Sequence, residues 1–286
     1  MKKIRFGTFE TNSSSTHAIV VPHNVDEENY NVYDSLDHEY DFGRQESRLV
    51  EHWDEKLAYV YYVLDNFRGR YTVRKTDEGY GCNIKVTSKE INAFKNKVQE
   101  AYKEVIKDTK NKPYSNDPTP TDIFNIMDNE NEYNKIAREL KYKVAWDKEK
   151  KEYVYAINEE KDEYRPLTKQ ENEVYNLCLK LPELFNYGSI YVDHTEDFAE
   201  NGFIEKIINA DVEYIKRMIF NKDSYITIGG DEYRGYNIKT IGFQYDYKED
   251  YVNNGTEECP QYEDIGEFWD KLKEYEKKND VFLKGN

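Results

Sequence analysis

The clearest pattern in the sequence is an apolar stripe between Gln45 and Phe67. Apolar residues recur there at steps of three and four: Val50, Trp53, Leu57, Val60, Tyr61, Leu64 and Phe67. This spacing places them on one face of a helix. Gly69 follows and is expected to end the helix, because glycine readily adopts the left-handed backbone of a helix end. The stripe therefore predicts a helix over 45–67 with one buried face.

Helix-like and strand-like segments alternate along the rest of the chain. Two hairpins are indicated, Arg70–Lys75 with Gly81–Val86 and Tyr142–Trp146 with Glu152–Ile157. We expect further helices at Ser88–Lys107, 121–140, 168–182, Asp197–Ile208, Asp211–Phe220 and Tyr262–Lys278, and further strands at Lys3–Phe9, His17–Pro22, Tyr187–Asp193, Ser224–Ile228 and Tyr236–Tyr245. Because the spacing is not that of regular βαβ units, it favours an α+β fold. This fold would combine a mixed, largely antiparallel sheet with hairpins and several packed amphipathic helices.

One segment has the composition of a linker. Pro113, Pro118 and Pro120 lie there among Asn, Ser, Thr and Lys. We therefore expect an N-terminal α+β region over 1–110, a linker over 111–120 and a C-terminal α+β region over 121–286. The alternative is one continuous domain with an inserted middle segment.

The composition excludes several classes of protein. Acidic residues exceed basic ones by 57 to 41, a net charge of −16, which argues against attraction to nucleic acid or a membrane surface by bulk charge. No apolar run reaches the roughly 18 residues of a membrane span. The three cysteines form no CxxC pair, no signal sequence opens the chain, and no metal or cofactor motif is found. We expect a protein of the bacterial cytoplasm without a cofactor, a metal site, a membrane or direct nucleic-acid contact.

Eight small or polar residues, Glu10 to His17, separate two apolar segments near the start of the chain. Consecutive Ser, Thr and Asn residues offer hydroxyls and turn-forming amides that can hold an anion. This predicts a binding role for Asn12, Ser13, Ser14 and Ser15. His17 could act as a general base or a metal ligand. Two structural alternatives are a β-turn satisfied by its own side chains and a buried hydrogen-bond network.

The same block, within FETNSSSTHAIVV, resembles the opening of a family of bacteriophage and low-GC bacterial proteins to which no activity is assigned. Two later pieces are similar to that family as well, GSIYVDH at 188–194 and FNKDSYITIGGDEYRGY at 220–236. The resemblance covers about a fifth of the chain and leaves residues 70–180 without a counterpart. It implies an origin in a phage or mobile element. It also implies that the residues of the block belong together, because similar proteins carry it intact: Glu10, Asn12, Ser13, Ser14, Ser15 and His17.

An enzyme is one interpretation of these residues. Asp193 and His194 end an expected strand, where side chains of α/β scaffolds are often exposed. The catalytic candidates are His17, His194, Asp193 and Glu10, which would line a pocket for a nucleotide or another anionic small molecule. Neighbouring strand residues point to opposite faces, so only one of Asp193 and His194 would face that pocket. A histidine that is merely hydrogen-bonded at a strand end is the structural alternative.

Two acidic stretches support the interpretation that we place first. Residues 22–42 contain seven acids and no Lys or Arg, and residues 246–264 contain seven acids and one Lys. Carboxylates on a rigid surface can imitate phosphates, and tyrosines add flat contact area. We expect a phage-type protein that binds and inhibits a host defence or nucleic-acid-processing protein with a basic surface. The binding residues would be Asp26, Glu27, Glu28, Tyr30, Asp246, Glu249, Asp250, Tyr251, Glu257 and Glu258.

Overall fold

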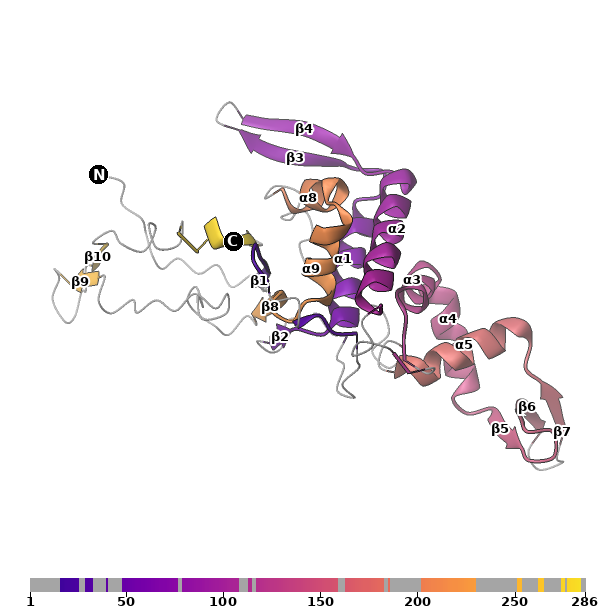
Figure 1. The fold of residues 1–286 in the computed structure, drawn as a ribbon. Helices are drawn as coiled ribbons and strands as arrows, with labels where there is room; N and C mark the ends of the chain where they lie inside the picture. The colour runs from indigo at the N-terminus through magenta and orange to yellow at the C-terminus, as the bar shows by residue number, and fades with distance from the viewer. Residues whose placement is uncertain are drawn as a thin grey trace.

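Helices and antiparallel strands build an α+β fold, which confirms the predicted fold class (Figure 1). The computed structural model describes residues 16–25, 29–32, 40, 48–76, 79–107, 113–114, 117–158, 163–182, 185, 202–229, 251–253, 262–264, 274–275 and 277–283. The expected strands Lys3–Phe9, Tyr187–Asp193 and Tyr236–Tyr245 lie outside these residues. No helix in the described ranges combines the length and the apolar character needed to cross a bilayer.

A four-stranded antiparallel sheet forms the centre of the molecule. Its order is β11 (Asn279–Leu283), β1 (Thr16–Pro22), β8 (Tyr225–Gly229) and β2 (Arg48–Val50). Three successive residues of β1, Ile19, Val20 and Val21, are at most 1 % exposed. Because neighbouring strand residues point to opposite faces, both faces of β1 are covered. Burial on both faces explains why the residues that predicted this strand are consecutive apolar residues and do not alternate with polar ones.

One face of the sheet is covered by helices (Figure 1). These are α1 (Trp53–Asn66), α8 (Phe203–Asn209) and α9 (Val212–Phe220), and α2 (Ser88–Val105) packs on α8 and α9 from the outside. The predicted apolar stripe is buried from Val50 to Phe67. The helix itself begins at Trp53 and not at Gln45, because residues 48–50 pair with β8 instead.

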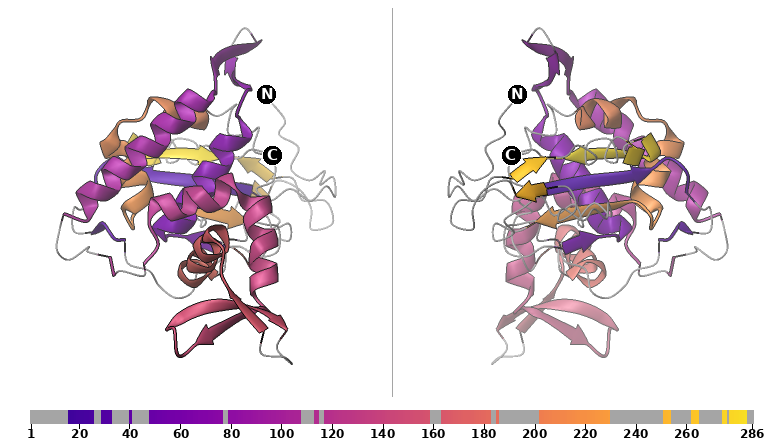
Figure 2. Two further views of the ribbon diagram at one scale, coloured as in Figure 1. Left: turned by 90° about the vertical axis from the view of Figure 1, so that its right-hand side faces the viewer. Right: turned by 90° about the vertical axis from the view of Figure 1, so that its left-hand side faces the viewer.

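A hairpin follows α1, as predicted. Gly69 has φ +82° and its amide donates to the carbonyl of Val86 at 2.8 Å, so the chain turns there into β3 (Tyr71–Thr76). β4 (Gly79–Lys85) returns antiparallel to it. Figure 2 shows this hairpin projecting at one end of the molecule, and the three-stranded sheet described next at the other.

A second lobe contains the middle of the chain. Three helices, α3 (Pro120–Asp128), α4 (Glu130–Leu140) and α5 (Lys169–Lys180), adjoin an antiparallel sheet of β5 (Val144–Asp147), β6 (Glu152–Asn158) and β7 (Glu163–Pro166). The single helix expected over 121–140 is divided at Asn129, whose side chain donates to the carbonyl of Asn125 at 2.9 Å. Pro120, which we placed in the linker, is the first residue of α3.

Three helices begin at a threonine that satisfies the free amides of the first turn. Thr87, Thr119 and Thr168 each form a reciprocal capping box with the acid three residues later. Such a cap contributes about 1 kcal/mol. Ser88, at which we expected α2 to begin, is its first helical residue, and Thr87 is the cap.

Two further boundaries differ from the predictions. Tyr262–Asp264 forms strand β10, paired with β9 (Tyr251–Asn253), so no helix begins at Tyr262. α8 begins at Phe203 after Gly202, which has φ +80° and therefore cannot continue a right-handed helix.

The main hydrophobic core includes Ile19, Leu57, Val174 and Ile215, so it draws on residues from both sides of 111–120.

Candidate functional site

The polar N-terminal block leads directly into the central strand of the sheet. Thr16 pairs with Gly229 and His17 pairs with Ile228, in the antiparallel register of β1 and β8. Two of the segments that carry the phage-family resemblance, 9–21 and 220–236, are therefore hydrogen-bonded neighbours. Because β1 begins where β8 ends, Thr16 and Gly229 lie at the same end of these two strands.

Most of the predicted site residues lie outside the described part of the chain. These are Glu10, Asn12, Ser13, Ser14, Ser15, Asp26, Glu27, Glu28, Asp193, His194, Asp246, Glu249, Asp250, Glu257 and Glu258. Their roles stay predictions, and so does the pocket between the N-terminal block and Asp193-His194. Tyr251 begins β9, where it pairs with Asp264 of β10.

Tyr30 is buried, contrary to our expectation of an exposed binding residue. Its side chain is 7 % exposed and its hydroxyl donates to Glu213 Oε1 at 3.3 Å. The ammonium of Lys216 lies 4.9 Å from the centre of its ring. Tyr40, in the same acidic stretch, is also buried and donates to the carboxylate of Asp54. Both rings are large enough to fill core space while each hydroxyl finds an acceptor.

A buried ammonium group joins α1 to the turn between α9 and β8. Lys56 is 2 % exposed, and its Nζ donates to the carbonyl oxygens of Asn221 at 2.6 Å and Ser224 at 2.7 Å. Burial lowers the pKa of Lys56 to about 7, although nearby carboxylates, first that of Glu51, oppose this shift. Two main-chain carbonyls accept hydrogen bonds from this amine, so it links α1 to the turn before β8. The same bonds keep it from acting as a nucleophile.

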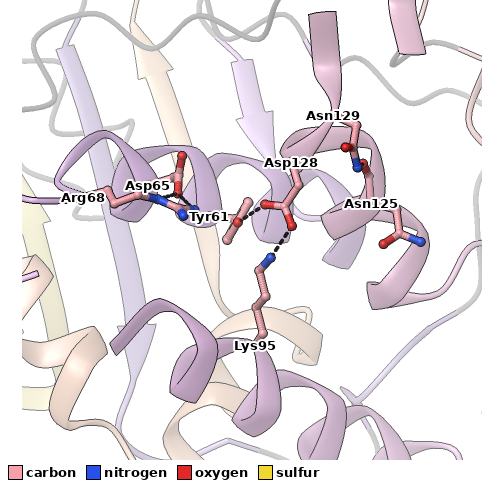
Figure 3. A network of polar contacts seen from close by, with 7 residues as sticks. All are labelled: Tyr61, Asp65, Arg68, Lys95, Asn125, Asp128 and Asn129. Atoms are coloured by element: carbon pink, nitrogen blue, oxygen red, sulfur yellow. Dashed lines mark hydrogen bonds and ion pairs between the residues drawn. The ribbon is translucent and has the colours of Figure 1, made fainter. Parts of the chain in front are cut away.

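A second polar network joins α1, α2 and α3 (Figure 3). Asp128 on α3 accepts hydrogen bonds from the Tyr61 hydroxyl and the Lys95 ammonium, both at 2.5 Å. Burial, together with the hydrogen bond to Asp128, raises the pKa of Tyr61 well above its usual value. Tyr61 is therefore a permanent donor at neutral pH. These hydrogen bonds hold the three helices together, and none of the three side chains is placed to act as a base or a nucleophile.

A shallow polar pocket of about 170 Å³ lies between α3 and α5, lined by Asp122, Asn125, Glu173, Asn176, Leu177 and Lys180. Its charged groups already have partners. Lys180 pairs with Asp122 at 3.1 Å, and Glu173 accepts from the hydroxyl of Tyr133 at 2.9 Å. No group of three or more His, Cys, Asp or Glu side chains in the described residues is arranged to hold a metal ion.

We compared the chain with protein-family models, curated proteins and solved structures, and none matches it.

Sequence reasoning missed two groups that the structure brings together. Lys56 lies beside Asp54 and Glu55, and such a run usually indicates a solvent-exposed helix face, yet all three are buried. Trp146 and Tyr153 face each other across the β5–β6 hairpin and remain partly exposed. A lysine-rich turn between two aromatic strands is the signal that would have drawn attention to this second group.

Proposed function

We propose that this chain is a phage-type accessory protein that binds and inhibits a host defence or nucleic-acid-processing protein. Contact would be made by two acidic segments, 22–42 and 246–264, with a basic surface of the partner. The inhibitor would work by occupying a surface that otherwise receives the phosphates of a nucleic acid.

One observation carries the proposal: nearly all of the surplus negative charge resides in the two acidic segments. Segment 22–42 contributes −7 and segment 246–264 contributes −6, so together they hold −13 of the net −16. The other residues of the chain are close to neutral. Charges needed only for solubility would be expected to be distributed along the chain.

The described residues indicate how segment 22–42 is attached to the fold. The amide of Asn31 donates to the carbonyl of Phe220 at 3.0 Å, and that of Lys222 donates to the carbonyl of Asn29 at 3.1 Å. Buried Tyr30 and Tyr40 add side-chain contacts to the core. The segment is thus hydrogen-bonded to the fold at its described residues Asn29 and Asn31 and packed against the core at Tyr30 and Tyr40.

The second acidic segment contains the β9–β10 hairpin. In Figure 1 this hairpin lies on the side of the central sheet that faces away from α1, α2 and α9. A negative region away from the helical layer would attract a cationic partner over about a Debye length, roughly 10 Å at 0.1 M salt. Complex formation is then expected to be fast and sensitive to salt.

Immobilised full chain should retain proteins from a bacterial lysate at low salt and lose them at moderate salt. We would neutralise eight predicted contact acids in one variant: Asp26→Asn, Glu27→Gln, Glu28→Gln, Asp246→Asn, Glu249→Gln, Asp250→Asn, Glu257→Gln and Glu258→Gln. Retention at low salt should fall to background with this variant. The matched control removes the same number of exposed acids outside both segments and should leave retention unchanged; it changes to Gln the residues Glu100, Glu104, Glu132, Glu139, Glu149, Glu152, Glu163 and Glu274.

Two outcomes would count against the proposal. Retention that does not change with salt would exclude a long-range electrostatic interaction. Equal losses in the segment variant and in the control would show that total charge matters and the segments do not. The enzyme alternative instead predicts that His17→Ala abolishes an activity on an anionic small molecule, whereas the inhibitor should retain its partner with this change.

A further inference from the structure

The sheet of the second lobe presents a row of aromatic rings to solvent. Trp146 on β5 pairs with Tyr153 on β6, and their ring centres lie 4.8 Å apart at an interplanar angle of 65°. The ring of Tyr153 also contacts the ring of Tyr175 on α5, and their centres lie 4.6 Å apart. The side chains of Trp146 and Tyr153 are 49 % and 38 % exposed. By contrast, Trp53 in the main core is 3 % exposed.

The chain reverses its sign of charge in the same place. Residues 141–151 contain five lysines against two acids, a local net charge of +3 in a chain of −16, whereas residues 152–163, which run from β6 to the start of β7, contain five acids and one lysine. All five are exposed: Lys141, Lys143, Lys148, Lys150 and Lys151. One of the two acids, Asp147, accepts from the amides of Glu149 and Lys150 at 3.0 and 3.1 Å and pairs with the ammonium of Lys150 at 3.4 Å. Tyr142, 75 % exposed, adds a third ring between two of these lysines.

Packing of the lobe explains only part of this surface. The interior of the hairpin is formed by Val154 and Ala156, which are 3 % and 2 % exposed, and Tyr175 packs against the main core. Tyr153, whose side chain points to the opposite face from Val154, contacts Tyr175 of α5. The open half of Trp146 and the ring of Tyr142 contribute little to it, because burial is what makes an aromatic side chain stabilising.

We propose that the β5–β6 hairpin binds single-stranded nucleic acid, with bases stacking on Trp146, Tyr153 and Tyr142 and phosphates contacting the five lysines. Every base offers a flat face, so an exposed aromatic row surrounded by cations suits a single strand of any sequence. An acidic polypeptide would satisfy the lysines but would give the indole of Trp146 no flat partner. In a duplex the bases are stacked on each other, so the rings would gain nothing there.

The overall charge of the chain does not exclude this contact. The surplus acids belong to segments 22–42 and 246–264, and Figure 1 places β9–β10 at the opposite side of the molecule from β5–β7. Repulsion between exposed charges that lie more than a Debye length apart is screened by salt. The inference does not depend on the proposed inhibitor function.

Fluorescence of the full chain offers a direct test, with oligothymidylate of about 15 nucleotides as the probe, a length that spans the 4–16 nucleotides of a typical single-strand site. At low salt the oligonucleotide should quench the emission of the exposed Trp146. The dissociation constant should rise with salt, with a log–log slope of at most about 3.5 if all five lysines contact phosphates. Binding measured by anisotropy of a labelled oligonucleotide should weaken about 10-fold or more in Trp146→Ala.

Lysine variants separate the local charge from the total charge. Lys148→Glu with Lys150→Glu and Lys151→Glu should abolish binding. The matched control, Lys89→Glu with Lys103→Glu and Lys135→Glu, changes the net charge equally at exposed positions on α2 and α4 and should bind within about 3-fold of wild type. Emission of the buried Trp53 and the thermal melting curve report whether each variant is folded.

Three results would overturn the inference. These are the absence of oligothymidylate binding at low salt, unchanged binding in folded Trp146→Ala, and equal weakening by the two lysine triple variants. Polyglutamate that binds as tightly as the oligonucleotide would assign the surface to an acidic polypeptide instead. A duplex of the same length that binds more tightly than the single strand would remove the stacking argument.

Discussion

The buried ammonium of Lys56 on α1 lies 2.6 Å from the carbonyl oxygen of Asn221, the residue that directly follows α9. The same ammonium also donates to the carbonyl of Ser224 at 2.7 Å. A buried charge is costly unless hydrogen bonds and opposite charges compensate it. Lys56 therefore joins the helical layer to the start of β8, the strand that runs beside His17.

Replacing Lys56 by Met should destabilise the fold. The two carbonyl oxygens would lose their donor while remaining buried, and the loss should be about 1–3 kcal/mol in the free energy of unfolding at neutral pH. Urea unfolding of both chains, followed by far-UV circular dichroism, measures it. The control is Lys103→Met, at an exposed position of α2, which should change stability by less than about 0.5 kcal/mol. A fully stable Lys56→Met chain would contradict the role that we assign to this ammonium.

The pH dependence of this contribution has a defined sign. The pKa of Lys56 is lowered from 10.5 to about 7 in the folded chain, so between these values the unfolded state binds the additional proton. Stability then rises with pH, by at most about 1.4 kcal/mol per unit for this group. The groups that face the ammonium are the carboxylates of Glu51, Asp54, Glu55 and Asp223. The stability of wild type relative to Lys56→Met should therefore increase from pH 7 to pH 9, and a constant difference would contradict the lowered pKa.

Asp128 should contribute more to stability than Asp65, although each carboxylate pairs with a cation (Figure 3). Asp128 accepts from both Tyr61 and Lys95, so Asp128→Ala leaves a partly buried hydroxyl and an ammonium without their acceptor. Because Asp128 is itself 36 % exposed and the difference comes from its second donor, we expect a loss of about 1–2 kcal/mol. The side chains of Asp65 and Arg68 are 42 % and 46 % exposed, and Asp65→Ala should cost less than about 1 kcal/mol. Thermal and urea unfolding of both variants would test the ranking, which equal losses would contradict.

Local signals in the sequence predicted much of the fold. The stripe from Val50 to Phe67 follows from helical periodicity, and Gly69 does adopt the left-handed backbone expected of a helix end. The boundaries that were wrong depend on partners distant in the chain. Residues 48–50 form a strand because β8 lies beside them, and Tyr262–Asp264 forms one because β9 does.

The candidate sites were harder to predict for the same reason. The sequence around Tyr30 is acidic and polar, which favours exposure, but its hydroxyl and ring contact Glu213 and Lys216 of the distant helix α9. Lys56 likewise has its acceptors at Asn221 and Ser224. A single sequence carries no information about such pairs, because tyrosine and lysine are compatible with both exposed and buried positions.

Substitution of Gly69 and Gly202 measures the free-energy cost of a left-handed backbone separately from the cost of a steric clash. Their φ values are +82° and +80°, and a Cβ added at either position would meet no heavy atom within 4 Å. Gly69→Ala and Gly202→Ala should therefore each lose about 1–2 kcal/mol, the cost of left-handed backbone for an L-residue. Thermal unfolding should give similar losses for the two. A much larger loss at one of them would mean that its side chain also disturbs packing.

Acid should weaken the junction between β7 and α5. Arg165 donates to both carboxylate oxygens of Glu171 at 2.7 Å, and the amide of Thr168 donates to the same group. These bonds, first those from Arg165, lower the pKa of Glu171 from 4.5 to about 2. Because the folded-state pKa is the lower one, the stabilisation is complete above pH 4.5 and is lost as the pH falls towards 2.

The matching variant is Glu171→Gln, which cannot titrate. Between pH 5 and pH 3, wild type should lose about 1 kcal/mol more stability than this variant, a value reduced from the full linkage because Arg165 is partly exposed. Urea unfolding at both pH values measures the difference. Glu163→Gln, at an exposed position of β7, is the control and should follow wild type. If Glu171→Gln lost as much stability on acidification as wild type does, the carboxylate of Glu171 would not be the group that acid titrates at this junction.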